Sequence, residues 1–253
     1  TGAAGEGGAP PTPDPTPTPP PDTRPPTGDT AAAAPVGRDP IEVDKRAIAM
    51  VLLVDRSWSM GTRLPNGHTK MSYAKSSALR TAQGLTAGDR VALVTFGNKD
   101  AGRVELPLTD ATDAATVRAG IGKLAHATEE TYLLGGLRAA NELLAVSRAA
   151  VKHVVVITDG EFDISEALVL QALARRMVQE EKATLSVISI IDGMTKSSFK
   201  REAERITAAG GGQFFAVEDP TFVPTLVSAE VTRALQRVGR DPGEGGVDPD
   251  RAP

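Results

Sequence analysis

The sequence predicts an α/β fold: a doubly wound, mostly parallel six-stranded sheet with one antiparallel edge strand and helices on both faces. Short apolar, β-branched runs alternate with amphipathic stretches, which is typical of strands joined by crossover helices. Four of the six candidate strands are near-continuous apolar runs, as expected for strands buried on both faces. Residues 41–238 carry nearly all the large apolar side chains and have the size of one domain.

The expected elements follow in chain order. The candidate strands are Ala47–Asp55, Arg90–Gly97, Arg103–Leu106, Lys152–Thr158, Thr184–Ile191 and Gln213–Val217. The candidate helices, several with apolar residues on one face at helical spacing, are Lys70–Ala82, Ala114–Leu124, Leu133–Ala149, Ile164–Lys182, Lys196–Ala208 and Thr221–Arg237. Glycines 210, 211 and 212 are expected to end the fifth helix. The third strand is short and closely follows the second, so we expect it to be the antiparallel edge strand.

Both ends of the chain differ in composition from the rest. Twelve of the 19 prolines lie in residues 1–40, which contain no Leu, Ile or aromatic residue. Such a segment cannot bury enough apolar surface to offset its ordering entropy, so we predict a disordered Pro/Thr/Gly-rich linker. Residues 239–253 are predicted to form a flexible C-terminal tether. Because the chain begins with Thr1, we expect a processed protein or a segment of a longer one.

Charge and residue usage exclude several classes of function. The net charge is −4, with 28 basic and 32 acidic residues interspersed, so we expect no nucleic-acid partner. The absence of cysteine excludes disulfides, thiolate metal sites and cysteine nucleophiles. The longest apolar run, Ala47–Val54, is too short to span a membrane. His68, His126 and His153 are scattered, and we expect them to be structural or solvated rather than catalytic.

A group of oxygen-bearing residues follows the first candidate strand. Asp55, Ser57 and Ser59 alternate in a loop that is still roughly extended, so their side chains can converge on one point. Oxygen-only donors suit a hard divalent cation such as Mg²⁺, Mn²⁺ or Ca²⁺. The alternative is that the serines cap the next helix. That helix is expected to start near Lys70, about ten residues later, which weakens the alternative.

Two further positions lie on later loops. Asp159 follows the fourth candidate strand, and a right-handed crossover can place that strand beside the first. Two carboxylates that meet at this edge need a cation or a proton between them, although Asp159 also fits a simple Asp-Gly turn. Thr131 precedes the third helix and is either a hydroxyl donor to the same point or the helix N-cap.

In this order and spacing, these residues resemble the von Willebrand factor type A domain and its metal-ion-dependent adhesion site, or MIDAS. The family pattern is Asp-x-Ser-x-Ser after the first strand, a Thr in the second loop and an Asp in the third. The resemblance implies a complete MIDAS that holds Mg²⁺, or Mn²⁺ or Ca²⁺, through Asp55, Ser57, Ser59, Thr131 and Asp159. It also implies a non-enzymatic, adhesion-type module whose metal captures an Asp or Glu carboxylate of a partner protein.

The sequence departs from the family pattern at three points. Trp58 replaces the small residue between the serines, and is either an exposed partner contact or packs onto Leu64–Thr69. Glu129 and Glu130 stand where the family usually has Gly, so they either strengthen cation binding or repel or replace an acidic ligand. We expect Trp58, Glu130 and Tyr132 to be the partner contacts.

The end of the domain resembles bacterial proteins of this family. The stretch from Gly210 to Pro220 and the last helix look like those of membrane-associated or envelope members. The resemblance favours the bacterial cell envelope or exterior over the cytoplasm, with a membrane-anchored parent protein as one arrangement. Proline-rich and Gly/Asp-rich tethers at both ends agree with a displayed module.

Two other functions are compatible with a sheet of this kind. A metal-dependent phosphoryl-transfer enzyme of the haloacid-dehalogenase type also has an Asp after its first strand, but it needs Asp-x-Asp where this chain has Asp55 and Ser57. Such an enzyme also needs an acidic pair after a later strand, and only Asp159 is in the expected place. The remaining alternative is a fold without a site that serves as a spacer.

Overall fold

The computed structural model describes residues 44–99, 102–127, 130–160, 162–191 and 196–240. The chain divides into two units, Thr1–Pro40 and Ile41–Pro253, and every described residue lies in the second. The predicted linker, residues 1–40, and residues 241–253 of the predicted tether lie outside the described residues, so both assignments stay predictions. In the described part of the chain, no helix is long and apolar enough to cross a membrane.

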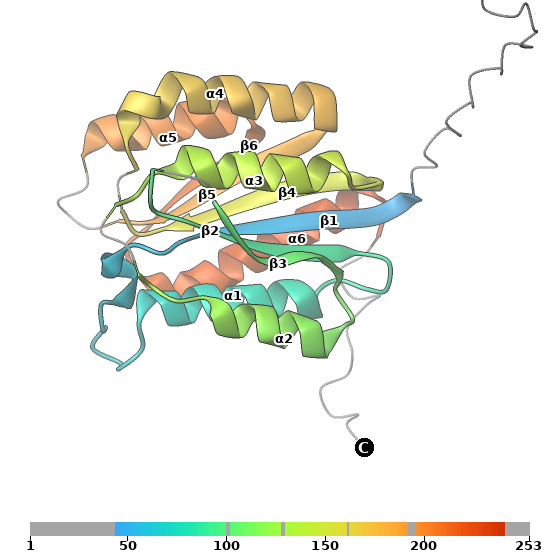
Figure 1. Ribbon diagram of the computed structural model, residues 1–253, viewed down its shortest axis with the longest axis horizontal. Coiled ribbons are helices and arrows are strands. Elements are labelled where there is room, and N and C mark those ends of the chain that lie inside the picture. Colours follow the sequence, from blue (N-terminus) through green and yellow to red (C-terminus); the bar gives the residue numbers. More distant parts are fainter. Residues whose placement is uncertain (1–43, 100–101, 128–129, 161, 192–195, 241–253) are drawn as a thin grey trace, which may run out of the picture. The chain divides into compact units, whose positions relative to one another are not determined.

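One six-stranded sheet forms the centre of the domain (Figure 1). Its strand order is β3-β2-β1-β4-β5-β6, and all neighbours are parallel except the antiparallel pair β2 and β3. This order confirms the predicted fold class, including the antiparallel strand at one edge. The strands are β1 (Asp44–Asp55), β2 (Arg90–Phe96), β3 (Arg103–Asp110), β4 (Ala149–Thr158), β5 (Ala183–Ile190) and β6 (Gly211–Val217).

Helices cover both faces of the sheet (Figure 1). One face packs against α1 (Lys70–Gln83), α2 (Ala114–Lys123) and α6 (Val223–Arg237). The other face packs against α3 (Leu133–Ala145), α4 (Ala167–Arg176) and α5 (Ser197–Ala209). Shorter helical turns are η1 (Trp58–Gly61), η2 (Ile164–Glu166), η3 (Met177–Glu181) and η4 (Pro220–Phe222).

Burial on both faces explains the continuous apolar run of β1. Met50 and Leu52 belong to the core beneath α1, α2 and α6, whereas Val51 and Leu53 belong to the core beneath α3, α4 and α5. Successive side chains of a strand point to opposite faces, so a strand between two helix layers needs apolar residues at every position. The register of β1 therefore fixes the position of its last residue, Asp55, at the carboxyl edge of the sheet.

Two predicted helices are wrong in extent. The predicted helix Leu133–Ala149 ends at Ala145, because Ala149 already belongs to β4 and pairs with Asp44 of β1. Pairing with a neighbouring strand here outweighs the helix propensity of a local Ala-rich stretch. The predicted single helix Ile164–Lys182 is a 3₁₀ turn, α4 and a π-helical turn, which ends at Lys182 in the left-handed conformation with φ 57°.

Two predicted boundaries near strands are also wrong. The edge strand extends to Asp110 instead of ending at Leu106, and it contains Pro107. A proline is tolerated there because an edge strand leaves one row of backbone groups without a ladder partner. The predicted stop of the fifth helix is confirmed, with Gly210 as its C-cap, but the last strand begins at Gly211 and not at the predicted Gln213.

Candidate functional site

The predicted ligands lie on the loops at the carboxyl edge of the sheet, where β1 and β4 end, at the left of Figure 1. Strands β1 and β4 are parallel neighbours, with Val54 paired to Ile157. Asp55 ends β1, and Asp159 directly follows the last residue of β4. Parallel strands end at the same edge, so two aspartates far apart in the sequence come together there.

The two serines bind the second aspartate. The Ser59 hydroxyl donates to Oδ1 of Asp159 at 2.8 Å, and the Ser57 hydroxyl donates to the same oxygen at 3.5 Å. The two serine Oγ atoms are 3.0 Å apart. Ser57 precedes η1 without a side-chain capping bond, and α1 is capped by Thr69. The serine side chains therefore form the oxygen cluster and do not cap a helix.

Asp55 is completely buried and held from two sides. Its Oδ1 accepts the backbone N–H of Ser57 at 2.7 Å, and its Oδ2 accepts the hydroxyl of Thr158 at 2.6 Å. Burial raises the pKa of Asp55 from 3.8 to about 6; the bonds from Thr158 and Ser57 lower it, and the nearby Asp159 carboxylate raises it. The carboxyl group is thus ionised at neutral pH, and a cation beside it would relieve the energetic cost of its burial.

Thr131 reaches the same edge from the loop before α3. The N-cap of α3 is Tyr132, without a side-chain bond, so the interpretation of Thr131 as the N-cap is wrong. A Cβ atom built on Gly160 would lie 3.3 Å from Oγ1 of Thr131 and 3.8 Å from Oδ2 of Asp55. These two oxygens therefore face one common point. All five predicted ligands lie at this edge of the sheet.

Sequence reasoning missed two side chains of the cluster. Thr158 is the hydroxyl that holds Asp55, and Lys70 is a cation whose Nζ lies 2.5 Å from Oδ2 of Asp159. The side chain of Asp159 is fully buried, whereas 20% of the Lys70 side chain is exposed. One feature of the sequence points to Lys70. It is the first residue of a helix that begins near the same edge, and a positive charge at a helix N-terminus is disfavoured unless it has an acidic partner.

The donor set fits a hard divalent cation. It consists of two carboxylates and three hydroxyls, and oxygen ligands are those that Mg²⁺, Mn²⁺ and Ca²⁺ prefer. Among the described residues, no group of three or more His, Cys, Asp or Glu side chains could hold a metal. A metal site here would therefore depend on hydroxyl ligands as well as carboxylates.

The expected partner contacts lie next to the cluster. Trp58 is 62% exposed, and its ring meets that of His126 edge-on with 5.8 Å between centroids. Tyr132 is partly exposed, and Nζ of Lys99 lies 5.7 Å from its ring centroid. Glu130 is exposed and engaged in an interaction with another residue, and Glu129 lies outside the described residues.

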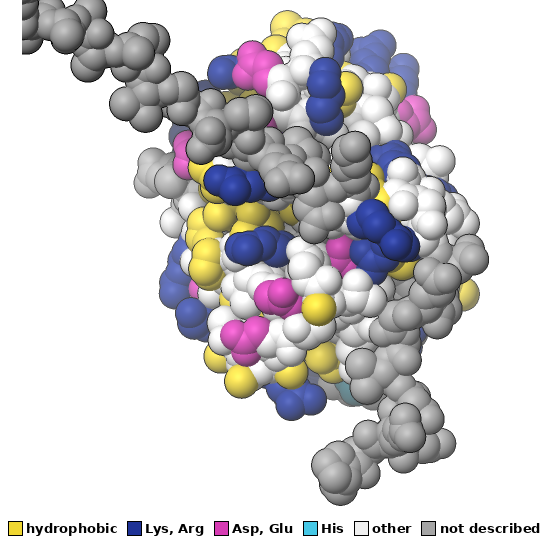
Figure 2. All heavy atoms as spheres, turned by 90° about the vertical axis from the view of Figure 1, so that its right-hand side faces the viewer, with side chains coloured by type: hydrophobic (Ala, Val, Ile, Leu, Met, Phe, Trp, Pro, Cys, Tyr) yellow, Lys and Arg dark blue, Asp and Glu magenta, His cyan; other side chains and the backbone are white. Residues whose placement is uncertain are grey.

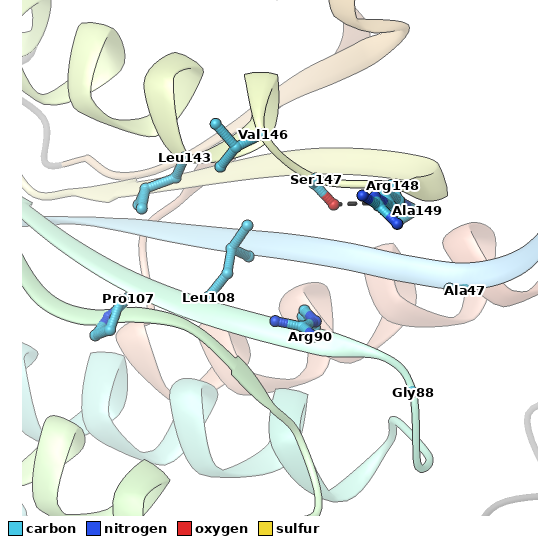
Figure 3. A pocket seen from close by; sticks show the side chains of 10 residues that line it. All are labelled: Ala47, Gly88, Arg90, Pro107, Leu108, Leu143, Val146, Ser147, Arg148 and Ala149. Carbon is cyan, nitrogen blue, oxygen red and sulfur yellow. Dashed lines mark hydrogen bonds between the residues drawn. The ribbon is translucent and has the colours of Figure 1, made fainter. Parts of the chain in front are cut away.

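A separate pocket of about 640 Å³ lies at the opposite end of the sheet, where the parallel strands begin (Figure 3). Hydrophobic side chains gather beside Lys and Arg side chains at this end of the molecule (Figure 2). None of the five predicted ligands lines the pocket, so it is distinct from the oxygen cluster. Its lining residues are Ala47, Gly88, Arg90, Pro107, Leu108, Leu143, Val146, Ser147, Arg148 and Ala149.

Comparisons with known proteins agree with this topology. The family profile of the von Willebrand factor type A domain matches residues 50–161, from the middle of β1 to just after β4. The fold is that of a von Willebrand factor type A domain. No curated protein sequence gives a significant match.

Three solved structures illustrate the likeness. A von Willebrand factor type A protein from Catenulispora acidiphila is 22% identical with a TM-score of 0.60, and the match covers 74% of this chain and 42% of that one. The PilB minor pilin from Streptococcus sanguinis is 14% identical with a TM-score of 0.64, and the match covers 76% of this chain and 62% of the pilin. The third is proximal thread matrix protein 1 from the mussel byssus, whose structure has a zinc-occupied MIDAS motif. It is 18% identical with a TM-score of 0.58, and the match covers 75% of this chain and 47% of the mussel protein. The chain spans less than two thirds of each of these proteins, and identities this low support the fold alone.

Proposed function

We propose that this domain is a non-enzymatic, adhesion-type module that binds a partner protein through a divalent cation. Asp55, Ser57, Ser59, Thr131 and Asp159 would hold the ion, which we propose to be Mg²⁺, with Mn²⁺ and Ca²⁺ as the other candidates. The observation that carries the proposal is the direct bonding of the serines after β1 to the aspartate after β4. The zinc-occupied MIDAS of the mussel protein, which has a similar fold, supports it.

Some residues of the cluster would supply charge and oxygen ligands, and others hold these ligands in place. Asp55 and Asp159 supply two negative charges, which balance a divalent ion, and the hydroxyls supply only neutral oxygens, so the ion would stay electrophilic towards a further oxygen ligand. The backbone N–H of Ser57 and the hydroxyl of Thr158 fix both oxygens of Asp55. When bound, the ion would offer an open coordination position to an Asp or Glu carboxylate of the partner. Such a desolvated, charge-assisted contact is a natural hot spot of an interface.

Exposed side chains next to the cluster would complete the interface. Trp58 lies between two of the proposed ligands in the sequence, and we propose that its exposed indole contacts the partner. Tyr132 and Glu130 flank Thr131 on the neighbouring loop, and we propose that they contact the partner as well. The phosphoryl-transfer alternative is not favoured, because the hydroxyl of Ser57 stands where that chemistry needs a second carboxylate.

The two ends of the described domain meet far from the proposed site. Arg240, after α6, donates to Oδ1 of Asp89 at 2.8 Å and to the backbone carbonyl of Arg46 in β1 at 3.3 Å. This contact lies at the beginning of β1, opposite the edge that carries Asp55. We propose that the module is displayed at the bacterial envelope or outside the cell, with a membrane-anchored parent as one arrangement, and that its metal edge lies at the end of the domain opposite Arg46 and Arg240. The minor pilin among its structural neighbours supports this location.

Calorimetric titration of Mg²⁺ into the wild type and the Asp55→Ala variant tests the proposal. We expect the wild type to bind one ion and to gain thermal stability, as linkage requires, and the variant to do neither. Asp113→Ala is the matched control, because Asp113 is an exposed carboxylate that caps α2 away from the cluster. Binding by the control but not by Asp55→Ala assigns the ion to this edge, and no binding by the wild type contradicts the proposal.

A further inference from the structure

Lys70 is the one cation seen bonded to the proposed metal ligands among the described residues. Its Nζ lies 2.5 Å from Oδ2 of Asp159, while Oδ1 of the same carboxylate accepts the hydroxyls of Ser57 and Ser59. Both oxygens of Asp159 are therefore engaged, one by hydroxyls that are themselves proposed ligands and one by an ammonium group. A divalent ion that binds Asp159 must compete with this ammonium group for the same charge.

The position of Lys70 in its helix is unfavourable for a positive charge. Lys70 is the first residue of α1, and the first turn of α1 contains no acidic residue that could offset the helix dipole. Thr69 and Ser72 form a complete capping box, so the N-terminus of the helix needs no help from the lysine side chain. The ion pair with Asp159 is the contact that compensates for this placement, which points to a role at the cluster rather than in the helix.

The loop before α1 fixes the backbone of Lys70. Arg63 and Thr69 form an isolated antiparallel bridge, and the side chain of Asn66 donates to the hydroxyl of Tyr73 in α1 at 2.7 Å. The amide of Leu64 donates to the carbonyl of His68 at 2.8 Å, which closes the loop on itself. The lysine therefore starts from a fixed point, yet 20% of its side chain reaches solvent. Its ammonium group has a route out of the cluster without any movement of the helix.

We propose that Lys70 is an internal competitor of the divalent ion: it neutralises Asp159 until the ion displaces it, and it then pairs with the partner's carboxylate. This inference rests on the proposed function and names a second contact for the same ligand. Competition with Lys70 weakens binding of the metal alone, and release of the ammonium strengthens binding of a carboxylate once the metal is present. Metal and carboxylate are then positively coupled through one side chain.

The Lys70→Met variant, which keeps the apolar stem and removes the charge, tests this coupling. Mg²⁺ is titrated by calorimetry into the full chain with and without saturating acetate, which is the carboxylate probe. Loss of a competing unit charge at contact distance should tighten Mg²⁺ binding by about tenfold, and acetate should then enhance Mg²⁺ binding less than in the wild type. Lys75→Met, which removes a charge five residues further along α1, is the matched control and should leave both quantities unchanged.

Thermal unfolding separates this role from a purely structural ion pair. In EDTA, Lys70→Met should melt below the wild type, because the buried Asp159 carboxylate has lost its cation; in saturating Mg²⁺ the difference should vanish or reverse. An equal loss of stability in both conditions identifies a structural ion pair and overturns the proposal. Lys70→Arg keeps the charge and should retain the wild-type affinity for Mg²⁺. If the wild type and both Lys70 variants bind Mg²⁺ equally, the metal site is supported and the proposed role of Lys70 is refuted. If neither the wild type nor the variants bind Mg²⁺, the metal site itself is refuted.

Discussion

Thr158 donates a 2.6 Å hydrogen bond to Oδ2 of Asp55, so the last residue of β4 holds the last residue of β1. The bond orients a carboxylate that burial would otherwise keep protonated: burial raises the pKa of Asp55 to about 6, and Thr158 opposes that rise. Stability and metal binding therefore make opposite demands on this residue. Folding favours a neutral group at this position, and a divalent ion requires a charged one.

The isosteric variant Asp55→Asn should separate these demands. Its amide oxygen can accept the Ser57 N–H, and the Thr158 hydroxyl can turn to the carbonyl of Gly160, which is 3.2 Å away. We expect Mg²⁺ binding to be lost and the unfolding free energy in EDTA at pH 8 to rise. The upper bound is about 3 kcal/mol, because each pKa unit corresponds to about 1.4 kcal/mol and the shift runs from 3.8 to about 6.

Urea unfolding in EDTA, followed by calorimetry with Mg²⁺, measures both effects. A variant that is less stable than the wild type in EDTA would show that the charged form of Asp55 is favoured by the fold itself. A variant that still binds Mg²⁺ would remove Asp55 from the ligand set.

The same pKa predicts how metal binding depends on pH. Below about pH 6 a proton occupies Asp55, so the Mg²⁺ affinity should fall about tenfold per pH unit there and level off above about pH 7. In EDTA, where no metal is bound, the folding stability changes with pH in the opposite direction. A raised pKa stabilises the fold below the ordinary value of 3.8, and that stabilisation is lost as the pH rises through about 6. Titrations at pH 5, 6, 7 and 8 check the first statement, and an affinity independent of pH contradicts it.

Much of the fold could be predicted because its signals are local and redundant. The apolar run of β1 reflects burial on both faces, and it marks a central strand without knowledge of its neighbours. The meeting of the predicted ligands could be expected because they lie in loops after β1 and β4 and before α3, and the topology gathers these loops at one edge. Their role as metal ligands stays a prediction. The end of α3 could not be predicted, because pairing between β4 and Asp44 of β1 decides it and the local Ala-rich sequence does not.

Contacts between distant side chains were the part that sequence could not supply. Lys70 and Asp159 are 89 residues apart, and their meeting depends on where the loop before α1 starts the helix relative to the end of β4. The sequence left His153 as structural or solvated, and the structure shows it buried with its Nε2 2.9 Å from Oε2 of Glu230. In neither pair do both residues lie in the same helix or strand, so no periodic pattern in the sequence indicates the contact.

Glu230 should be important for stability and irrelevant to metal binding. It is buried on α6, and it meets His153 of β4, Arg233 of its own helix and the hydroxyl of Ser186 of β5, the last at 2.9 Å. Burial alone would raise the pKa of Glu230, but His153, Ser186 and Arg233 together lower it, so the carboxylate is charged. Removing one partner of such a buried cluster costs about 3 kcal/mol or more.

We therefore expect Glu230→Ala to lower the unfolding free energy by about 3 kcal/mol and to bind Mg²⁺ with wild-type affinity in the native baseline. Glu204→Ala, an exposed carboxylate on α5, is the control and should change the stability by less than about 0.5 kcal/mol. Urea unfolding and calorimetry provide the two readings. A change in Mg²⁺ affinity on Glu230→Ala would mean that α6 is coupled to the metal edge.

Gly160→Ala probes the space between Thr131 and Asp55 without removing any ligand. The added Cβ would lie 3.3 Å from Oγ1 of Thr131, so the threonine must shift by a few tenths of an ångström. The fold should tolerate this shift, whereas metal–oxygen bonds are short and depend on the position of each donor, so displacing one donor should weaken Mg²⁺ binding. We expect a stability change below about 1 kcal/mol and a Mg²⁺ affinity several-fold weaker.

Gly122→Ala is the matched control for this substitution. Gly122 lies in α2 with nothing within 4 Å of its would-be Cβ, so alanine there should stabilise the helix by about 0.5–1 kcal/mol and leave Mg²⁺ binding unchanged. If Gly160→Ala binds Mg²⁺ as tightly as the wild type, that result contradicts the prediction that Mg²⁺ binds the Thr131 hydroxyl at its present position.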